Sequence, residues 1–196
     1  MLKIVAPLFL ALFILVPGSA ANCTITPRSD SLKVGDEAPQ FVMRNLFSDE
    51  GTFLRDFTGK TLREPWIKKN RQVVVLSFWA TWCQPCKNEI PILTKLASEF
   101  VNQPVKFFLV NTGEKAEQNE DTIREIYNTR GYTLPCLVDP GSRYASLYMV
   151  HGLPVLIVID KFGIVRKINR GYYENFNIEL EKMLKELVKE EKTVKK

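Results

Sequence analysis

The chain has 196 residues, with 27 Lys and Arg against 22 Asp and Glu, which gives a formal net charge of +5. This length suffices for one domain with a sizeable core, and its four cysteines are too few for a disulfide-stapled scaffold. Lysines near the C-terminus alternate with glutamates, as on a solvated helix face, so we expect no nucleic-acid binding.

Residues 1–21 have the pattern of a secretory signal peptide. Lys3 supplies an early positive charge, an apolar run extends from Ile4 to Val16, and small residues follow. A run of about a dozen apolar residues is short for a membrane span, so we expect cleavage and a soluble extracytoplasmic protein of the bacterial periplasm. Two alternatives stay open, which are lipidation of Cys23 and an uncleaved N-terminal anchor.

Residues 22–33 are polar and lack periodicity, which indicates a tether before a single domain over residues 34–190. A hairpin is predicted at 41–46 and 52–54, and a charged loop at 59–72. Two strand and helix pairs follow, with strands at 73–79 and 105–110 and helices after Cys83 and over 116–129.

The remaining elements are a strand at 134–138, a short helix at 141–149, a hairpin of strands at 155–159 and 164–168, and a helix at 174–188. Residues 191–196 are predicted to be a disordered tail. Alternating β and α elements followed by an antiparallel hairpin predict an α/β fold with a mixed central sheet flanked by helices.

The strongest chemical signal is a pair of cysteines where an apolar strand gives way to a helix. Cys83 and Cys86 are two residues apart, with Pro85 between them. Unpaired N–H groups at a helix N-terminus stabilise a thiolate, so we expect a lowered pKa for Cys83. Cys86, one turn further on, is placed to close a disulfide with Cys83. The pattern predicts a dithiol–disulfide redox centre.

A structural zinc site is the alternative interpretation of two cysteines with this spacing. The other candidate ligands are Cys23, Cys136 and His151, which include no second closely spaced pair, so we expect no metal. Cys136 is interpreted as a buried inert thiol, with a third redox centre or a partner for Cys23 as alternatives. His151 is interpreted as incidental.

The segment from Phe78 to Lys87 resembles the active site of the thioredoxin superfamily. Pro91 is similar to its helix-kinking proline, and residues 151–154 resemble its cis-proline loop. Residues 87–91 resemble the TlpA/ResA-like branch of extracytoplasmic thiol-disulfide oxidoreductases, and residues 34–41 the N-terminal segment of the redoxin branch. The resemblance implies a thioredoxin fold with a central helix-strand insertion at 116–138.

The resemblance also implies a base for the reaction. Ser77 stands six residues before Cys83, where thioredoxin has a buried aspartate, and a serine does not serve as a base at ordinary pH. Glu89, on the helical face of Cys86, matches the active-site glutamate of the TlpA/ResA-like branch. We therefore predict Cys83, Cys86 and Glu89 as the catalytic residues.

Substrate-binding residues follow from the same resemblance. Pro154 is predicted to be cis and to expose the Leu153 backbone for antiparallel pairing with a substrate. Trp82 is predicted to form an apolar docking face beside the disulfide, with Pro85 next to it, while Trp79 packs in the core.

The resulting hypothesis is an extracytoplasmic thiol-disulfide oxidoreductase that reduces protein disulfides without a cofactor. A membrane thiol electron donor would regenerate its dithiol, since the compartment is oxidising. Residues Gln84 and Pro85 resemble the dipeptide of reducing relatives, apocytochrome c in cytochrome c biogenesis is one candidate client, and we expect a monomer.

Two other functions are alternatives to this hypothesis. A peroxiredoxin-type thiol peroxidase is disfavoured because Ala80 stands where those enzymes have Thr or Ser, three residues before the attacking cysteine. A copper-delivery protein using Cys83, Cys86 and His151 is disfavoured because such proteins space their cysteines one residue wider.

Overall fold

The computed structural model describes residues 31–59, 71–115 and 119–190. The chain from Ser31 onward forms one compact unit. The predicted signal peptide, most of the tether, Cys23 and the predicted tail lie outside the described residues, as do residues 60–70 and 116–118.

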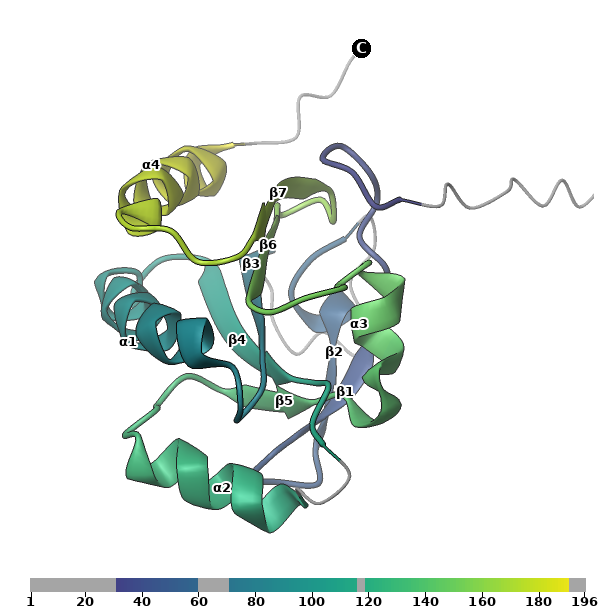
Figure 1. Ribbon diagram of the computed structural model, residues 1–196. Coiled ribbons are helices and arrows are strands. Elements are labelled where there is room, and N and C mark those ends of the chain that lie inside the picture. Colours follow the sequence, from purple (N-terminus) through teal and green to yellow (C-terminus); the bar gives the residue numbers. More distant parts are fainter. Residues whose placement is uncertain (1–30, 60–70, 116–118, 191–196) are drawn as a thin grey trace, which may run out of the picture. The chain divides into compact units, whose positions relative to one another are not determined.

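One mixed sheet of seven strands organises the described residues, in the order β2-β1-β5-β4-β3-β6-β7 (Figure 1). Its strands are β1 (Val42–Asn45), β2 (Gly51–Phe53), β3 (Val73–Trp79), β4 (Val105–Asn111), β5 (Cys136–Val138), β6 (Val155–Ile159) and β7 (Val165–Arg170). The β3, β4 and β5 strands run parallel to one another, and all other pairings are antiparallel. The predicted α/β fold with a mixed central sheet is confirmed.

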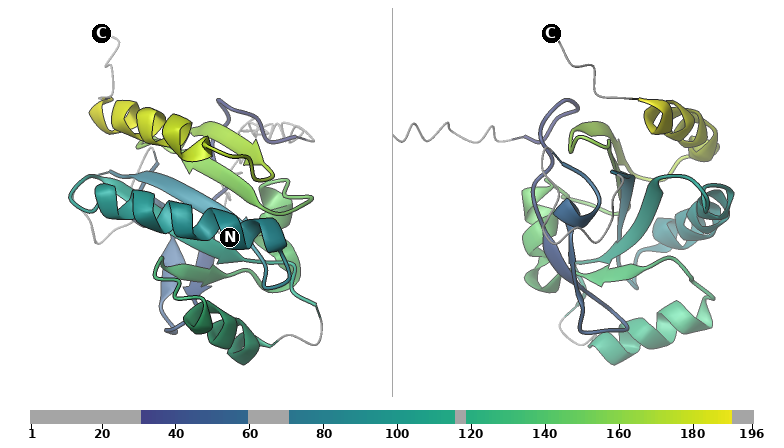
Figure 2. Two further views of the ribbon diagram at one scale, coloured as in Figure 1. Left: turned by 60° about the vertical axis from the view of Figure 1, so that its left-hand side comes forward. Right: turned by 180° about the vertical axis from the view of Figure 1, so that it is seen from behind.

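Helices cover both faces of this sheet. The helices α1 (Gln84–Glu99) and α4 (Phe176–Lys189) lie side by side over one face, as the left view of Figure 2 shows. On the other face lie α3 (Arg143–Leu147) and the short 3-10 helix η1 (Leu54–Asp56), while a second, η2 (Pro140–Ser142), leads into α3. No helix of the described residues is both long and apolar enough to cross a bilayer.

Strand β3 explains why both faces are covered. All seven of its residues are buried, and the six apolar ones alternate between two clusters on opposite faces of the sheet. Val75 and Trp79 belong to the cluster under α1 and α4, whereas Leu76 and Phe78 belong to the cluster under α3. A strand buried on both faces needs no polar alternation, which is why its sequence shows none.

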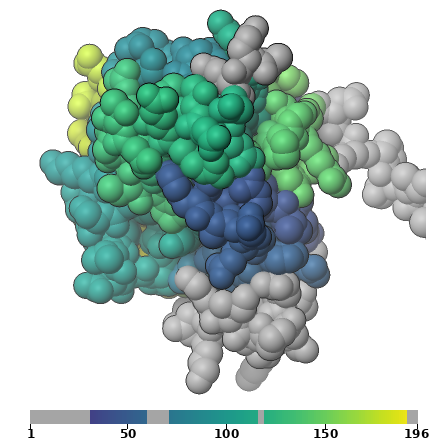
Figure 3. Space-filling model, turned by 90° about the horizontal axis from the view of Figure 1, so that it is seen from below, coloured from purple at the N-terminus to yellow at the C-terminus, as the bar shows by residue number. Residues whose placement is uncertain are grey.

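The predicted helix-strand insertion is present as α2 (Glu120–Thr129) and β5. Strand β5 lies between β4 and β1, so the insertion joins the N-terminal hairpin to the rest of the sheet. Arg44 of the hairpin pairs with Glu120, and Arg124 donates a hydrogen bond to the Leu46 carbonyl at 2.9 Å. Figure 3 shows α2 and the hairpin side by side.

Element boundaries differ from the predictions by a few residues. The last helix begins at Phe176 rather than 174, because Asn175 has a left-handed backbone with φ 61° and ends the preceding turn. The predicted helix at 141–149 is shorter, since Ser142 is also left-handed and separates η2 from α3.

Candidate active site

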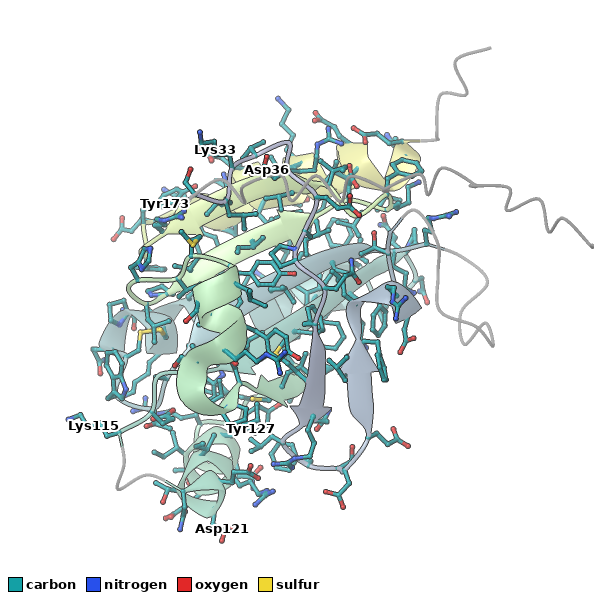
Figure 4. The ribbon with its side chains drawn as sticks, turned by 90° about the vertical axis from the view of Figure 1, so that its right-hand side faces the viewer. Lys33, Asp36, Lys115, Asp121, Tyr127 and Tyr173 are labelled. Atoms are coloured by element: carbon teal, nitrogen blue, oxygen red, sulfur yellow. A yellow bond between two sulfur atoms is a disulfide. The ribbon has the colours of Figure 1, made fainter. Side chains whose placement is uncertain are left out.

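A disulfide joins Cys83 and Cys86 at the start of α1, where Figure 4 draws it as a yellow bond. The two Cα atoms are 5.4 Å apart. Cys83 is the N-cap residue, and its Sγ accepts a hydrogen bond from the Cys86 amide at 3.2 Å. That amide is one of the unpaired donors of a helix N-terminus, so it would stabilise the Cys83 thiolate after reduction.

The turn before the disulfide is held by Glu114, which the sequence reasoning missed. The Thr81 amide and hydroxyl each donate to its carboxylate at 2.7 Å, and Asn111 Nδ2 donates at 2.6 Å. The Trp82 indole donates to the Gly113 carbonyl at 2.8 Å. Glu114 comes three residues after the end of β4, and the carboxyl ends of adjacent parallel strands meet at one sheet edge. Its position after a predicted strand is the sequence signal that could have identified it.

Glu89 is buried, with 1% of its surface exposed. Ser77 Oγ donates a hydrogen bond to its Oε1 at 2.7 Å, and Oε2 has no partner among the described residues. Burial raises the pKa of Glu89 to about 7, although the hydrogen bond from Ser77 lowers it. A carboxyl that titrates near neutral pH can both accept and release a proton there.

The loop before β6 carries the predicted proline. The peptide bond between Leu153 and Pro154 is cis. The Pro154 carbonyl accepts a hydrogen bond from the Gly171 amide at 2.8 Å, whereas no backbone hydrogen bond joins Leu153 to another described residue. Leu153 is half-buried and packs against the cluster that contains both bonded cysteines.

The predicted site residues thus fall into two groups. Cys83 at the N-cap of α1 is buried, as are Cys86 and Glu89 within the helix and Pro154 before β6. Leu153 packs against the apolar cluster that contains both cysteines. Trp82 and Pro85 are exposed beside the disulfide, and 47% of the Trp82 surface is open.

Three further residues were singled out in the sequence, which are Cys136, His151 and Trp79. Cys136 is a free thiol, fully buried, and burial raises its pKa to about 12, so it stays protonated at neutral pH. His151 is exposed, Trp79 is buried, and the described residues contain no group of three His, Cys, Asp or Glu side chains able to hold a metal ion.

Comparison with known proteins agrees with this geometry. The model of the AhpC/TSA family matches residues 34–168. The thiol-disulfide oxidoreductase ResA of Geobacillus thermodenitrificans is 34% identical over 72% of this chain and 71% of its own length. The thioredoxin-like protein YneN of Bacillus subtilis is 31% identical over 76% of this chain and 78% of its own length.

Solved structures show the same relationship. A putative thiol:disulfide interchange protein DsbE from Chlorobium tepidum is 25% identical, with a TM-score of 0.67 over 81% of this chain and 99% of its own. The pneumococcal exposed lipoprotein thioredoxin of Streptococcus pneumoniae is 28% identical, with a TM-score of 0.59 over 76% of this chain and 100% of its own. The chain therefore belongs to the AhpC/TSA family, in the thioredoxin-like branch of thiol-disulfide oxidoreductases that includes the ResA proteins.

Proposed function

We propose that this chain is an extracytoplasmic thiol-disulfide oxidoreductase that reduces disulfides in protein substrates. The observation that carries the proposal is the Cys83–Cys86 disulfide at the start of α1, with the buried carboxyl of Glu89 in the same helix and the same packed face. The names of the ResA and DsbE relatives agree with this chemistry.

The reaction starts from the reduced protein. The Cys83 thiolate attacks one sulfur of a substrate disulfide, which forms a mixed disulfide and releases the other substrate sulfur as a thiolate. Cys86 then attacks the Cys83 sulfur, so that the Cys83–Cys86 bond forms and the second substrate thiolate leaves. The substrate gains two electrons, and the protein ends in the oxidised form described above.

Glu89 serves as the base of the second step. The Cys86 thiol must lose its proton to attack, and a carboxyl with a pKa of about 7 is half ionised at neutral pH. After the proton has passed to Glu89, solvent takes it up when the substrate leaves. The buried position of Cys86 explains why a base inside the protein is needed, because water reaches this sulfur poorly.

Substrate docks beside the disulfide on Trp82, Pro85 and the loop at Pro154. The exposed Trp82 indole and Pro85 ring offer an apolar face. An extended substrate segment pairs with the Leu153 backbone, which has no backbone partner among the described residues.

Location and partners complete the proposal. Residues 1–21 act as a signal peptide and residues 34–190 as the catalytic domain. The protein acts in the periplasm as a monomer, receives electrons from a membrane thiol donor, and has apocytochrome c as a candidate client.

The deciding experiment traps the client. Cys86→Ser expressed in the native host leaves Cys83 unable to complete the exchange, so the client stays covalently attached. We expect adducts that dithiothreitol releases, and none from the matched Cys83→Ser/Cys86→Ser variant. Recovery of apocytochrome c supports a role in cytochrome c biogenesis, whereas a broad mixture of proteins supports a generalist reductase. Absence of any thiol-released adduct contradicts the proposal.

A thiol peroxidase is the second candidate, because residues 34–41 resemble the redoxin branch and lie inside the matched AhpC/TSA region. Ala80 is buried and supplies no hydroxyl near the attacking sulfur. Peroxide consumption by the reduced protein as fast as its reduction of a protein disulfide would favour this candidate.

A further inference from the structure

Ser77 is the one hydroxyl-bearing side chain of strand β3. It lies on the face of the sheet shared by Val75 and Trp79, under α1 and α4. Its neighbours across the sheet are Leu109 on β4 and Leu156 on β6, both members of the same apolar cluster. A hydroxyl in such surroundings costs free energy unless it is hydrogen-bonded, so the identity of its partner is informative.

That partner is the Glu89 carboxyl. Ser77 Oγ donates to Oε1 at 2.7 Å, and both residues are 1% exposed. The hydrogen bond joins the centre of β3 to the second turn of α1, and Glu89 accepts no other among the described residues. One oxygen of the carboxyl is therefore held, while Oε2 is left without a partner.

We infer that Ser77 is a positioning residue for the second exchange step, because its hydroxyl holds Oε1 of Glu89 and so presents Oε2 to take the Cys86 proton. This inference rests on the proposed function. In the step, the Cys86 S–H bond breaks and its proton passes to Glu89. The Cys86 sulfur bonds to Cys83, and the bond between Cys83 and the substrate sulfur breaks, with the electron pair leaving on the substrate.

Ser77 also favours the charged form of the base. Burial raises the pKa of Glu89 and the Ser77 hydrogen bond opposes it. The elements β4, β6 and α4 contribute apolar side chains to this cluster, and burial and the Ser77 hydrogen bond are the two causes that shift the pKa of Glu89. The other titratable members of the cluster are Cys83, Cys86, Tyr127, Tyr132 and Cys136. Burial raises the pKa of the last three, which keeps them neutral near pH 7.

The test measures only the second exchange step, in which Cys86 closes the disulfide with Cys83. The reduced protein reacts with dithiobis(nitrobenzoate), whose coloured thiolate is released once when Cys83 attacks and again when Cys86 closes the disulfide. The second release is timed by stopped flow across a pH series. We expect a wild-type midpoint near the Glu89 pKa of about 7. Ser77→Ala should raise the midpoint by about one pH unit and slow the second release about fivefold at neutral pH.

Matched variants at position 77 separate the loss of the hydroxyl from a general disturbance of core packing. Ser77→Thr and Ser77→Val have nearly equal volume and differ in the hydroxyl, so the pair decides the matter even where Ser77→Ala does not fold. We expect Ser77→Thr to keep the wild-type midpoint and Ser77→Val to raise it. Thr94→Ala removes a hydroxyl that donates a hydrogen bond to the Ile90 carbonyl of α1, and it should leave the midpoint unchanged.

A double variant provides the sharpest control. Since Ser77 acts through Glu89, Ser77→Ala should cause no further slowing once Glu89→Gln is present. Equal midpoints for Ser77→Val and Ser77→Thr, or additive slowing in the double variant, would overturn the inference. Failure of the proposed function has a different signature, because the wild-type protein would then show no second release at all.

Discussion

Two buried carboxylates of this protein have opposite surroundings. Asp139 accepts hydrogen bonds from the Tyr144 amide at 2.9 Å, from the Ala145 amide at 2.8 Å and from the Thr112 hydroxyl at 3.0 Å. Glu89 accepts one, from a serine, and leaves Oε2 without a partner among the described residues. The Asp139 carboxylate holds the start of α3 in place, whereas Glu89 has an unpaired oxygen, as the proposed proton transfer requires. The number of hydrogen bonds that each carboxyl accepts therefore separates a structural role for Asp139 from the role that we propose for Glu89.

The largest effect that tests this contrast is the pH dependence of stability. The pKa of Glu89 is raised from 4.5 to about 7 on folding, so its neutral form stabilises the native state fully below pH 4.5. That contribution should be lost as pH rises through about 7, with a total of about 3 kcal/mol. Urea unfolding of the oxidised wild-type protein, with Glu89→Gln subtracted, measures the change. A difference that does not vary with pH would contradict the assignment.

The next effect concerns the rate at which Cys86 closes the disulfide. Glu89→Gln should slow disulfide closure by Cys86 about 100-fold at neutral pH, because the base is lost while the shape is kept. Asp139→Asn should change the rate of disulfide closure less than about twofold, because the Asp139 carboxylate takes no part in the proposed proton transfer. Stopped-flow release of the nitrobenzoate thiolate compares the two variants, and equal slowing would remove the distinction between them.

For the free energy of unfolding, we expect the loss of the Asp139 carboxylate to matter more than the loss of the Glu89 carboxyl. Asp139→Ala leaves the Tyr144 and Ala145 amides without their acceptor and removes one of two side-chain partners of the Thr112 hydroxyl, so we expect a loss of about 2 kcal/mol in the free energy of unfolding. The double variant Ser77→Ala/Glu89→Met keeps the site apolar and leaves neither a carboxylate oxygen nor the Ser77 hydroxyl unpaired, so it should cost less than about 1 kcal/mol at neutral pH. Urea unfolding monitored by circular dichroism tests the ranking, and a larger loss for this double variant than for Asp139→Ala would reverse our interpretation.

The smallest effect is expected at Cys136. It shares the apolar cluster of the disulfide, but its raised pKa keeps it a thiol. Cys136→Ala should leave the exchange rates within about twofold and lower the free energy of unfolding by about 1 kcal/mol. Mass spectrometry of the oxidised wild-type protein should find this thiol free, and a bond to Cys23 or Cys83 would show that the cluster holds a third redox group.

Local patterns in the sequence were sufficient for the elements and for the disulfide at the start of a helix, whereas the proposed roles of Glu89 and Pro154 came from the family resemblance. Cysteines one helical turn apart after a β-branched run predict a disulfide at a helix start, and three-residue spacing places Glu89 on the face of Cys86. The cis bond at Pro154 was expected from the resemblance of its loop.

Tertiary packing decided the environment of those groups. Ser77 and Glu89 are 12 positions apart and meet only because α1 lies across β3, and Glu114 reaches Thr81 over 33 positions because β4 pairs with β3. Periodicity shows which side of a helix or strand a residue occupies, but not which side chain of another element lies opposite. Burial and hydrogen bonding set the pKa of Glu89, and both depend on contacts between segments distant in the chain.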